Sequence, residues 1–112
     1  MQRSAWTAAT RTPPDHRRVE RALVDHQAQL STRTGAHMVR IVNISPLGLM
    51  ARCPAELTVG QRVHFILPHV PPVAADVRWC EDGRIGVEFL MAIELPPYDR
   101  MLSAMTRRQN SW

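Results

Sequence analysis

Three arginines near the start of the chain, followed later by an asparagine, a serine and a glycine, form the grouping best suited to chemistry. The arginines are Arg17, Arg18 and Arg21. An arginine side chain carries a planar fork of N–H donors, which binds phosphate oxygens and the O6 and N7 edge of guanine bidentately. The chain has fourteen arginines and no lysine, and its formal net charge is +4. This balance favours an anionic partner but does not choose between a nucleotide, a nucleic acid and an acidic protein.

The second half of the grouping is the stretch Asn43-Ile44-Ser45-Pro46-Leu47-Gly48, a polar turn that continues into an apolar run. The Asn43 amide offers a donor and an acceptor, and Ser45 offers a hydroxyl. Because the two residues are two apart, they share one face of an extended segment. Gly48 leaves room for a ligand to approach the backbone. The same residues also suit a plain turn in which their side chains bond to nearby backbone, and the two roles are compatible.

These residues resemble the RxxxR and [D/N]xSxxG motifs of the PilZ domain family, small bacterial β-barrels that bind cyclic diguanylate (c-di-GMP). Val77-Arg78-Trp79 followed by Ile85-Gly86-Val87-Glu88-Phe89 resembles the late strand pair of that family. The likeness therefore extends over residues 16–91 in the family's order. It implies a c-di-GMP site, with no further cofactor or metal, formed by Arg17, Arg18, Arg21, Asn43, Ser45, Gly48 and Trp79. Asn43 offers a guanine edge one acceptor atom where the family's Asp offers two.

Six short segments have the features of β-strands. Four of them place apolar residues at every second position, residues 36–44 are rich in β-branched residues, and residues 47–52 resume as a strand after the turn. We expect strands over residues 20–31, 36–44, 47–52, 61–67, 73–79 and 85–89. Trp79 is in phase with Val73, Ala75 and Val77, and this phase predicts a core residue. The resemblance instead allows Trp79 to stack on the ligand.

The period changes after Pro96-Pro97, where Tyr98, Met101, Leu102 and Met105 fall on one stripe of a helix at about 95–109. Six strands and one helix predict a mainly β protein, a small antiparallel barrel capped by a C-terminal helix. The pattern alone permits an OB-like or SH3-like barrel equally well, whereas the resemblance implies a six-stranded PilZ-like barrel over residues 17–112. Residues 1–16 lack periodicity, and we expect a flexible N-terminal arm.

Several classes of protein fit the sequence poorly. The five histidines are scattered without metal-ligand spacing, and no G-x-S-x-G elbow or Gly-rich phosphate loop occurs, so we do not expect an enzyme. No apolar run approaches the ~20 residues of a membrane span, and the N-terminus has no apolar signal region. Cys53 and Cys80 lack CxxC spacing, which fits buried thiols in a reducing cytoplasm.

Three functions of different class stay open at this point. The first is a c-di-GMP receptor that signals to a downstream protein by ordering its N-terminal arm. The second is a PilZ-like protein-interaction module that does not bind c-di-GMP, although an intact RxxxR pattern favours binding. The third is a small barrel that binds nucleic acid, which we consider unlikely because aromatic residues are only 5% of the chain.

Overall fold

The computed structural model describes residues 21–109, and the side chains of residues 21–105. Six strands precede one helix: β1 (Ala22–Thr32), β2 (Gly35–Ser45), β3 (Gly48–Arg52), β4 (Arg62–Ile66), β5 (Val73–Glu81), β6 (Arg84–Phe89) and α2 (Leu95–Gln109). Each strand lies where the alternation predicts it, with ends shifted by a residue or two. Arg17, Arg18 and the arm expected over residues 1–16 lie outside the described residues.

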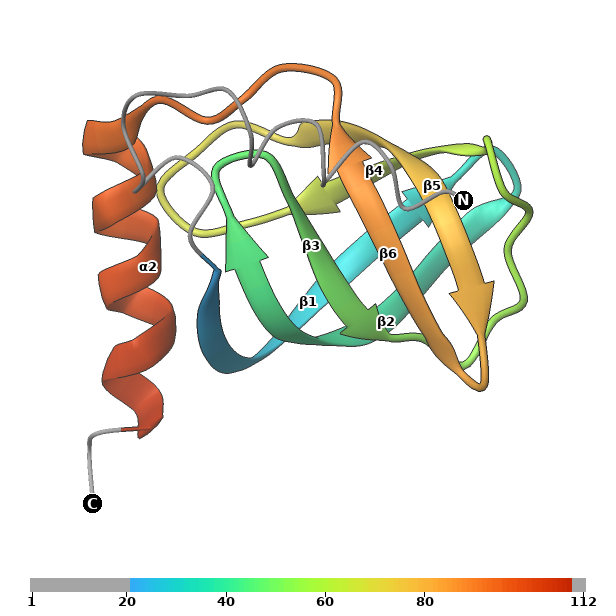
Figure 1. The fold of residues 1–112 in the computed structure, drawn as a ribbon, viewed down its shortest axis with the longest axis horizontal. Helices are drawn as coiled ribbons and strands as arrows, with labels where there is room; N and C mark the ends of the chain where they lie inside the picture. Colours follow the sequence, from blue (N-terminus) through green and yellow to red (C-terminus); the bar gives the residue numbers. More distant parts are fainter. Residues whose placement is uncertain (1–20, 110–112) are drawn as a thin grey trace.

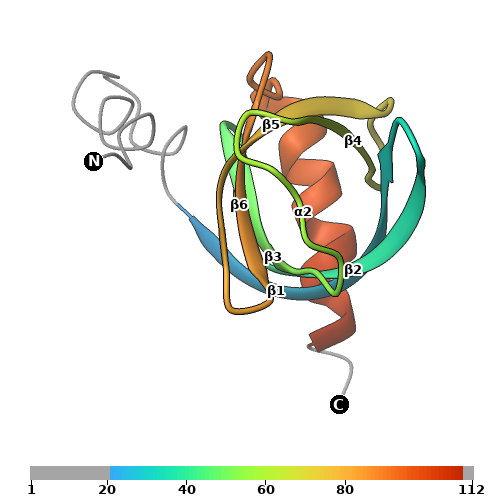
Figure 2. The ribbon, with the colours of Figure 1, turned by 90° about the vertical axis from the view of Figure 1, so that its right-hand side faces the viewer.

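The six strands close into one antiparallel barrel with the order β1-β2-β3-β6-β5-β4 (Figure 1). Closure joins β1 to β4 through the pairs Gln29 with Ile66 and Leu30 with Phe65. Seen from one end, the strands form a ring (Figure 2). The expected six-stranded antiparallel barrel with a C-terminal helix is therefore confirmed.

The core of the barrel is built from every second residue of each strand, because successive side chains point to opposite faces. Side chains that contribute to it and are fully buried include Leu30, Ile41, Leu49, Val63, Phe65, Val77 and Val87. Between β5 and β6 the chain turns at Asp82 and Gly83, which both have positive φ values, 54° and 75°. Positive φ at both central residues defines the hairpin turn that an Asp-Gly pair favours.

Helix α2 lies across the end of the barrel that holds the start of β1 and the turn between β2 and β3 (Figures 1 and 2). Its predicted apolar stripe faces the barrel, since Tyr98, Met101 and Met105 are buried and Leu102 is half-buried. Within the described part of the chain, no helix is long and apolar enough to cross a membrane.

A β-bulge in β5 overturns the expected phase of Trp79. The register with β6 shifts between Val77, which pairs with Val87, and Trp79, which pairs with Gly86. The shift turns Trp79 to the outer face, and Cys80 packs against the core instead. A Cβ atom added to Gly86 would lie 2.1 Å from Trp79 Nε1, so the indole covers the outer side of this glycine. Trp79 is half-buried there, and the expectation that it continues the inner face of β5 is wrong.

Replacing Gly86 by alanine should therefore destabilise the barrel, although alanine usually suits a strand better than glycine. The new methyl group would displace the indole of Trp79, and overpacking of this kind costs about 1–3 kcal/mol. Urea unfolding followed by circular dichroism measures the change. Gly35→Ala is the matched control, because a Cβ atom there meets nothing within 4 Å, and it should stay within about 0.5 kcal/mol of wild type.

The cause can be isolated with Trp79→Ala. In that background Gly86→Ala should not lower the free energy of unfolding. A double-mutant cycle would record this as a strong coupling between the two positions. If the Gly86→Ala and Gly35→Ala variants are equally stable, the packing of the Trp79 indole does not require a glycine at position 86.

Candidate functional site

Two bulges align two of the candidate residues, Asn43 and Trp79, with Met50 and Gly86 in one row on the outer face of the barrel. In β2 the register shifts between Ile41 and Asn43, and Asn43 then pairs with Met50 of β3. Met50 pairs with Gly86 of β6, and Gly86 pairs with Trp79 of β5. We call these four residues, Asn43, Met50, Gly86 and Trp79, the outer row. Their inward-pointing neighbours Ile44, Leu49 and Val87 are fully buried in the core, so the outer row faces away from it.

Asn43 holds an unused acceptor at one end of the outer row. Its side chain is 8% exposed. The amide Nδ2 donates to Met50 Sδ at 4.0 Å, a weak hydrogen bond. The Oδ1 atom is buried and has no hydrogen-bond partner in the structure. An unpaired buried acceptor costs about 1–3 kcal/mol, and a donor from a ligand would remove this cost.

Ser45 and Gly48 form the turn that follows Asn43. The Ser45 Oγ accepts a hydrogen bond from the Leu47 N–H at 3.1 Å, as the turn role predicts. Gly48 pairs with Ser45 on one side and with Glu88 of β6 on the other. Both residues are buried. The Ser45 hydroxyl is fully buried, and beside its turn role it keeps a proton for one further hydrogen bond.

The end of β6, the loop that follows it and the start of α2 fix the backbone around this turn from the other side. Three carbonyl groups within residues 44–47 accept hydrogen bonds from these elements. The Phe89 N–H donates to the Leu47 carbonyl at 2.8 Å, and the Ile93 N–H donates to the Pro46 carbonyl at 2.9 Å. The Tyr98 hydroxyl donates to the Ile44 carbonyl at 3.2 Å. The carbonyl of Ile44 lies between the two motif side chains, Asn43 and Ser45. The start of α2 therefore positions the motif.

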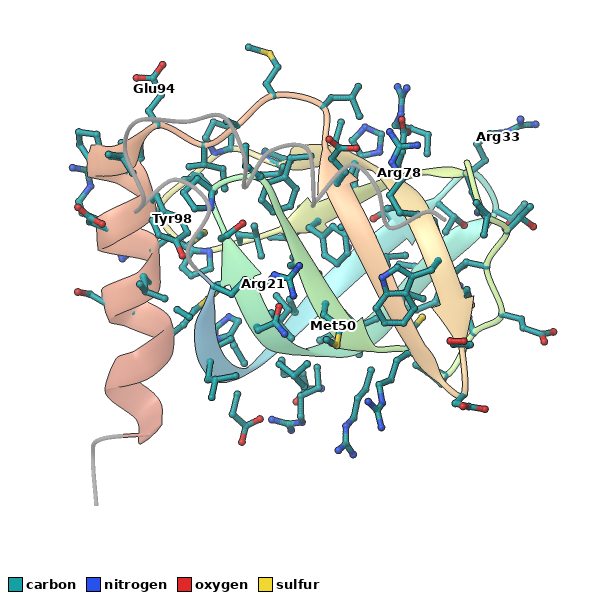
Figure 3. The ribbon with its side chains drawn as sticks, viewed as in Figure 1. Arg21, Arg33, Met50, Arg78, Glu94 and Tyr98 are labelled. Carbon is teal, nitrogen blue, oxygen red and sulfur yellow. The ribbon has the colours of Figure 1, made fainter. Side chains whose placement is uncertain are left out.

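Arg21 is the one motif arginine within the described residues. It directly precedes Ala22, the first residue of β1, which pairs with Ile44, so Arg21 lies just before β1 and beside the turn. It shares the outer face with Leu23, which pairs with Asn43 and is 78% exposed. In Figure 3 the Arg21 side chain extends from the start of β1 towards the strand that carries Met50. The structure thus brings Arg21, Asn43 and Ser45 together, whereas Arg17 and Arg18 lie outside the described residues.

Trp79 stands at the other end of the outer row, separated from Asn43 by β3 and β6. Three strand spacings of about 4.8 Å place it roughly 14 Å from Asn43. The spacing of residues in the sequence does not indicate that Met50 and Gly86 belong to this row, where they form the floor between Asn43 and Trp79. Only the strand register brings them there, although the glycine in the Ile85-Gly86-Val87 pattern marks a close contact in retrospect.

Exposed ion pairs surround the outer row. Arg40 pairs with Asp25, Arg62 with Asp76 at 2.7 Å, and Arg78 with Glu88 at 2.9 Å. Each such pair contributes about 0–1 kcal/mol, because water screens both charges. Among the described residues, no group of three His, Cys, Asp or Glu side chains is placed to hold a metal ion.

Comparisons with known proteins address the fold and the family. The chain resembles the crystal structure of the PilZ domain of CeSA from a cellulose-synthesizing bacterium, with a TM-score of 0.57 and 13% identity over 80% of this chain and 98% of that one. It also resembles the PlzA protein of Borreliella burgdorferi, solved in complex with c-di-GMP, with a TM-score of 0.59 and 11% identity. That match covers 90% of this chain but 44% of PlzA.

A comparison with curated proteins found no match. At such low identities the two structures show a shared fold. Residues 15–106 match the model of the PilZ domain family, and this range includes both the arginine and the asparagine motifs. The chain belongs to the PilZ domain family.

Proposed function

We propose that this protein is a receptor for c-di-GMP that binds the dinucleotide on the outer face of its barrel. The observation that carries the proposal is the buried, unpaired Oδ1 of Asn43 beside Arg21, in a chain of the PilZ family. The proposed site consists of Arg17, Arg18, Arg21, Asn43, Ser45, Gly48 and Trp79. PlzA, whose fold this chain shares, was solved with c-di-GMP bound, which supports the same ligand here.

In the proposed complex a guanine N–H group donates to Asn43 Oδ1, which fills the acceptor left unpaired in the free protein. Arg21 directly precedes β1 next to this position and supplies a guanidinium fork for a phosphate or for the guanine O6 and N7 edge. Arg17 lies one RxxxR spacing before Arg21 and reaches the same ligand from another side. Trp79 presents an indole on the outer face, where a second base can stack.

Signalling in this proposal runs through the N-terminal arm, residues 1–16. When Arg17 to Arg21 close over the ligand, the arm becomes ordered and presents a new surface to a downstream protein. Ordering costs about 1–2 kcal/mol for each residue fixed, so part of the binding free energy is spent on it. The protein acts by binding and not by catalysis, as other PilZ domains do.

We also propose a cytoplasmic location. Cys53 and Cys80 are both free thiols, which fits a reducing compartment. Cys53 is buried, and this burial raises the pKa of its thiol, so that it behaves as a small apolar residue rather than as a nucleophile.

Calorimetry with the purified protein tests the ligand itself. We expect c-di-GMP to release measurable heat at micromolar concentration and GMP to bind far more weakly, because only the cyclic dimer offers two guanines and two phosphates together. No heat with c-di-GMP at high micromolar concentration would remove the proposal and favour the protein-interaction module. Tight binding of single-stranded nucleic acid instead would favour the nucleic-acid-binding barrel.

Removing a motif arginine should weaken binding without unfolding the protein. Arg21→Ala should weaken c-di-GMP binding by about 1.5 kcal/mol or more, roughly tenfold in Kd, because a hydrogen bond to a charged group is lost. Arg17→Ala should behave likewise. Arg21→Lys should also bind weakly, since an ammonium group cannot make the planar fork. Titration calorimetry and thermal unfolding measure affinity and stability side by side.

Arg33→Ala is the matched control for these variants. Arg33 is an exposed arginine in the turn between β1 and β2, at the opposite end of the barrel from α2 (Figure 3). Its loss should change neither affinity nor stability. If Arg21→Ala lowers the melting temperature together with the affinity for c-di-GMP, this arginine is structural.

Hydrogen exchange tests the proposed signalling route. Adding c-di-GMP should raise the protection of residues 11–21 and 43–48 and leave residues 101–105 of α2 unchanged. Protection of residues 11–21 before ligand is added would contradict the ordering step. A change confined to residues 43–48 and 95–105 would place the output at α2, which contacts the motif through Tyr98.

A further inference from the structure

Two arginines outside the motifs face each other beside the outer row. Arg52 of β3 and Arg84 of β6 are directly paired in the register. Their neighbours Ala51 and Ile85 are fully buried in the core, so both arginines point to the outer face, where they are exposed. We call Arg52 and Arg84 the arginine pair.

The arginine pair differs from the other arginines on the strands in having no carboxylate. Like charges directly opposite each other destabilise a sheet. Arg40, Arg62 and Arg78 each have an ion-pair partner. In the described part of the chain, neither Arg52 nor Arg84 forms an ion pair, although Glu81 lies opposite Arg84 in the register. Two positive charges thus lie side by side, and neither forms an ion pair with the neighbouring carboxylate of Glu81.

The arginine pair adjoins the floor of the proposed site. Arg52 and Arg84 lie two residues along their strands from Met50 and Gly86, a distance of about 6.7 Å. The indole of Trp79 covers Gly86, and Met50 is half-buried, so the two long arginine side chains border this floor. Arg21 approaches from the other side of the outer row, where Ser45, Gly48 and Glu88 pair across the strands.

We propose that the arginine pair binds a phosphate of the dinucleotide that lies on the outer row, an inference that rests on the proposed function. Two adjacent guanidinium groups present enough N–H donors to satisfy both free oxygens of one phosphodiester. The ligand's negative charge also removes the repulsion between the two arginines. Arg17 and Arg21 then serve one side of the ligand, and Arg52 and Arg84 the other.

Single and double alanine variants of the arginine pair test this inference. Arg52→Ala and Arg84→Ala should each weaken c-di-GMP binding about tenfold in calorimetry. Affinity should also fall less steeply with added salt than in the wild type, because fewer charges act on the ligand. Stability in urea should stay equal or rise, since each variant removes a like-charge contact. Arg33→Ala should match the wild type in all three measurements.

The outcomes separate this inference from the function on which it rests. If the wild type binds c-di-GMP and both variants bind equally well, the arginine pair is not part of the site and the receptor function stands. If affinity and stability fall together, the pair is structural and the inference is overturned. If the wild type does not bind c-di-GMP, both proposals fail.

Discussion

The pairing register of β2, β3, β6 and β5 is the constraint on which the surface of this protein depends. Side chains alternate between the core and the outer face, so a shift of one residue moves a side chain to the other face. Bulges at two places make such shifts, between Ile41 and Asn43 and between Val77 and Trp79. Without the first, Asn43 would not face outward beside Met50. Without the second, Trp79 would lie in the core.

The same surface is supported from within by α2. Three hydrogen bonds, from the end of β6, from the loop after it and from α2, hold the carbonyl groups of Ile44, Pro46 and Leu47. The buried side chains of Tyr98, Met101 and Met105 fix the helix on the barrel end. The turn after Asn43 is thus anchored to both β6 and α2, and such anchoring suits the proposed recognition of a ligand by a few precise contacts.

Charge on the outer face is arranged unevenly. Ion pairs neutralise three of the strand arginines, whereas Arg52 and Arg84 are left opposite each other. Asn43 likewise keeps a buried acceptor without a donor. These features cost stability in the free protein, and they lie next to each other along two rows of the same sheet. The proposed ligand, c-di-GMP, has phosphates that suit the arginine pair and guanine N–H groups that suit Asn43.

Much of the fold followed from the sequence, because alternation and helical spacing are local properties of the chain. The six strands and the apolar stripe of α2 were predictable from the types and spacing of their residues. The motif residues were predictable as candidates from their types and spacing, and the family followed from their order. By itself the sequence determined which segments are strands and which residues can bind an anion.

Only the tertiary structure decided how those residues share a surface. A bulge leaves no reliable mark in the alternation, so the phase of Trp79 gave the wrong face. The contacts of Trp79 with Gly86 and of Arg52 with Arg84 join strands through the register of pairing, which the spacing within one strand does not contain. The hydrogen bond from Tyr98 to Ile44 joins residues far apart in the chain. Such contacts depend on barrel closure, a property of all six strands together.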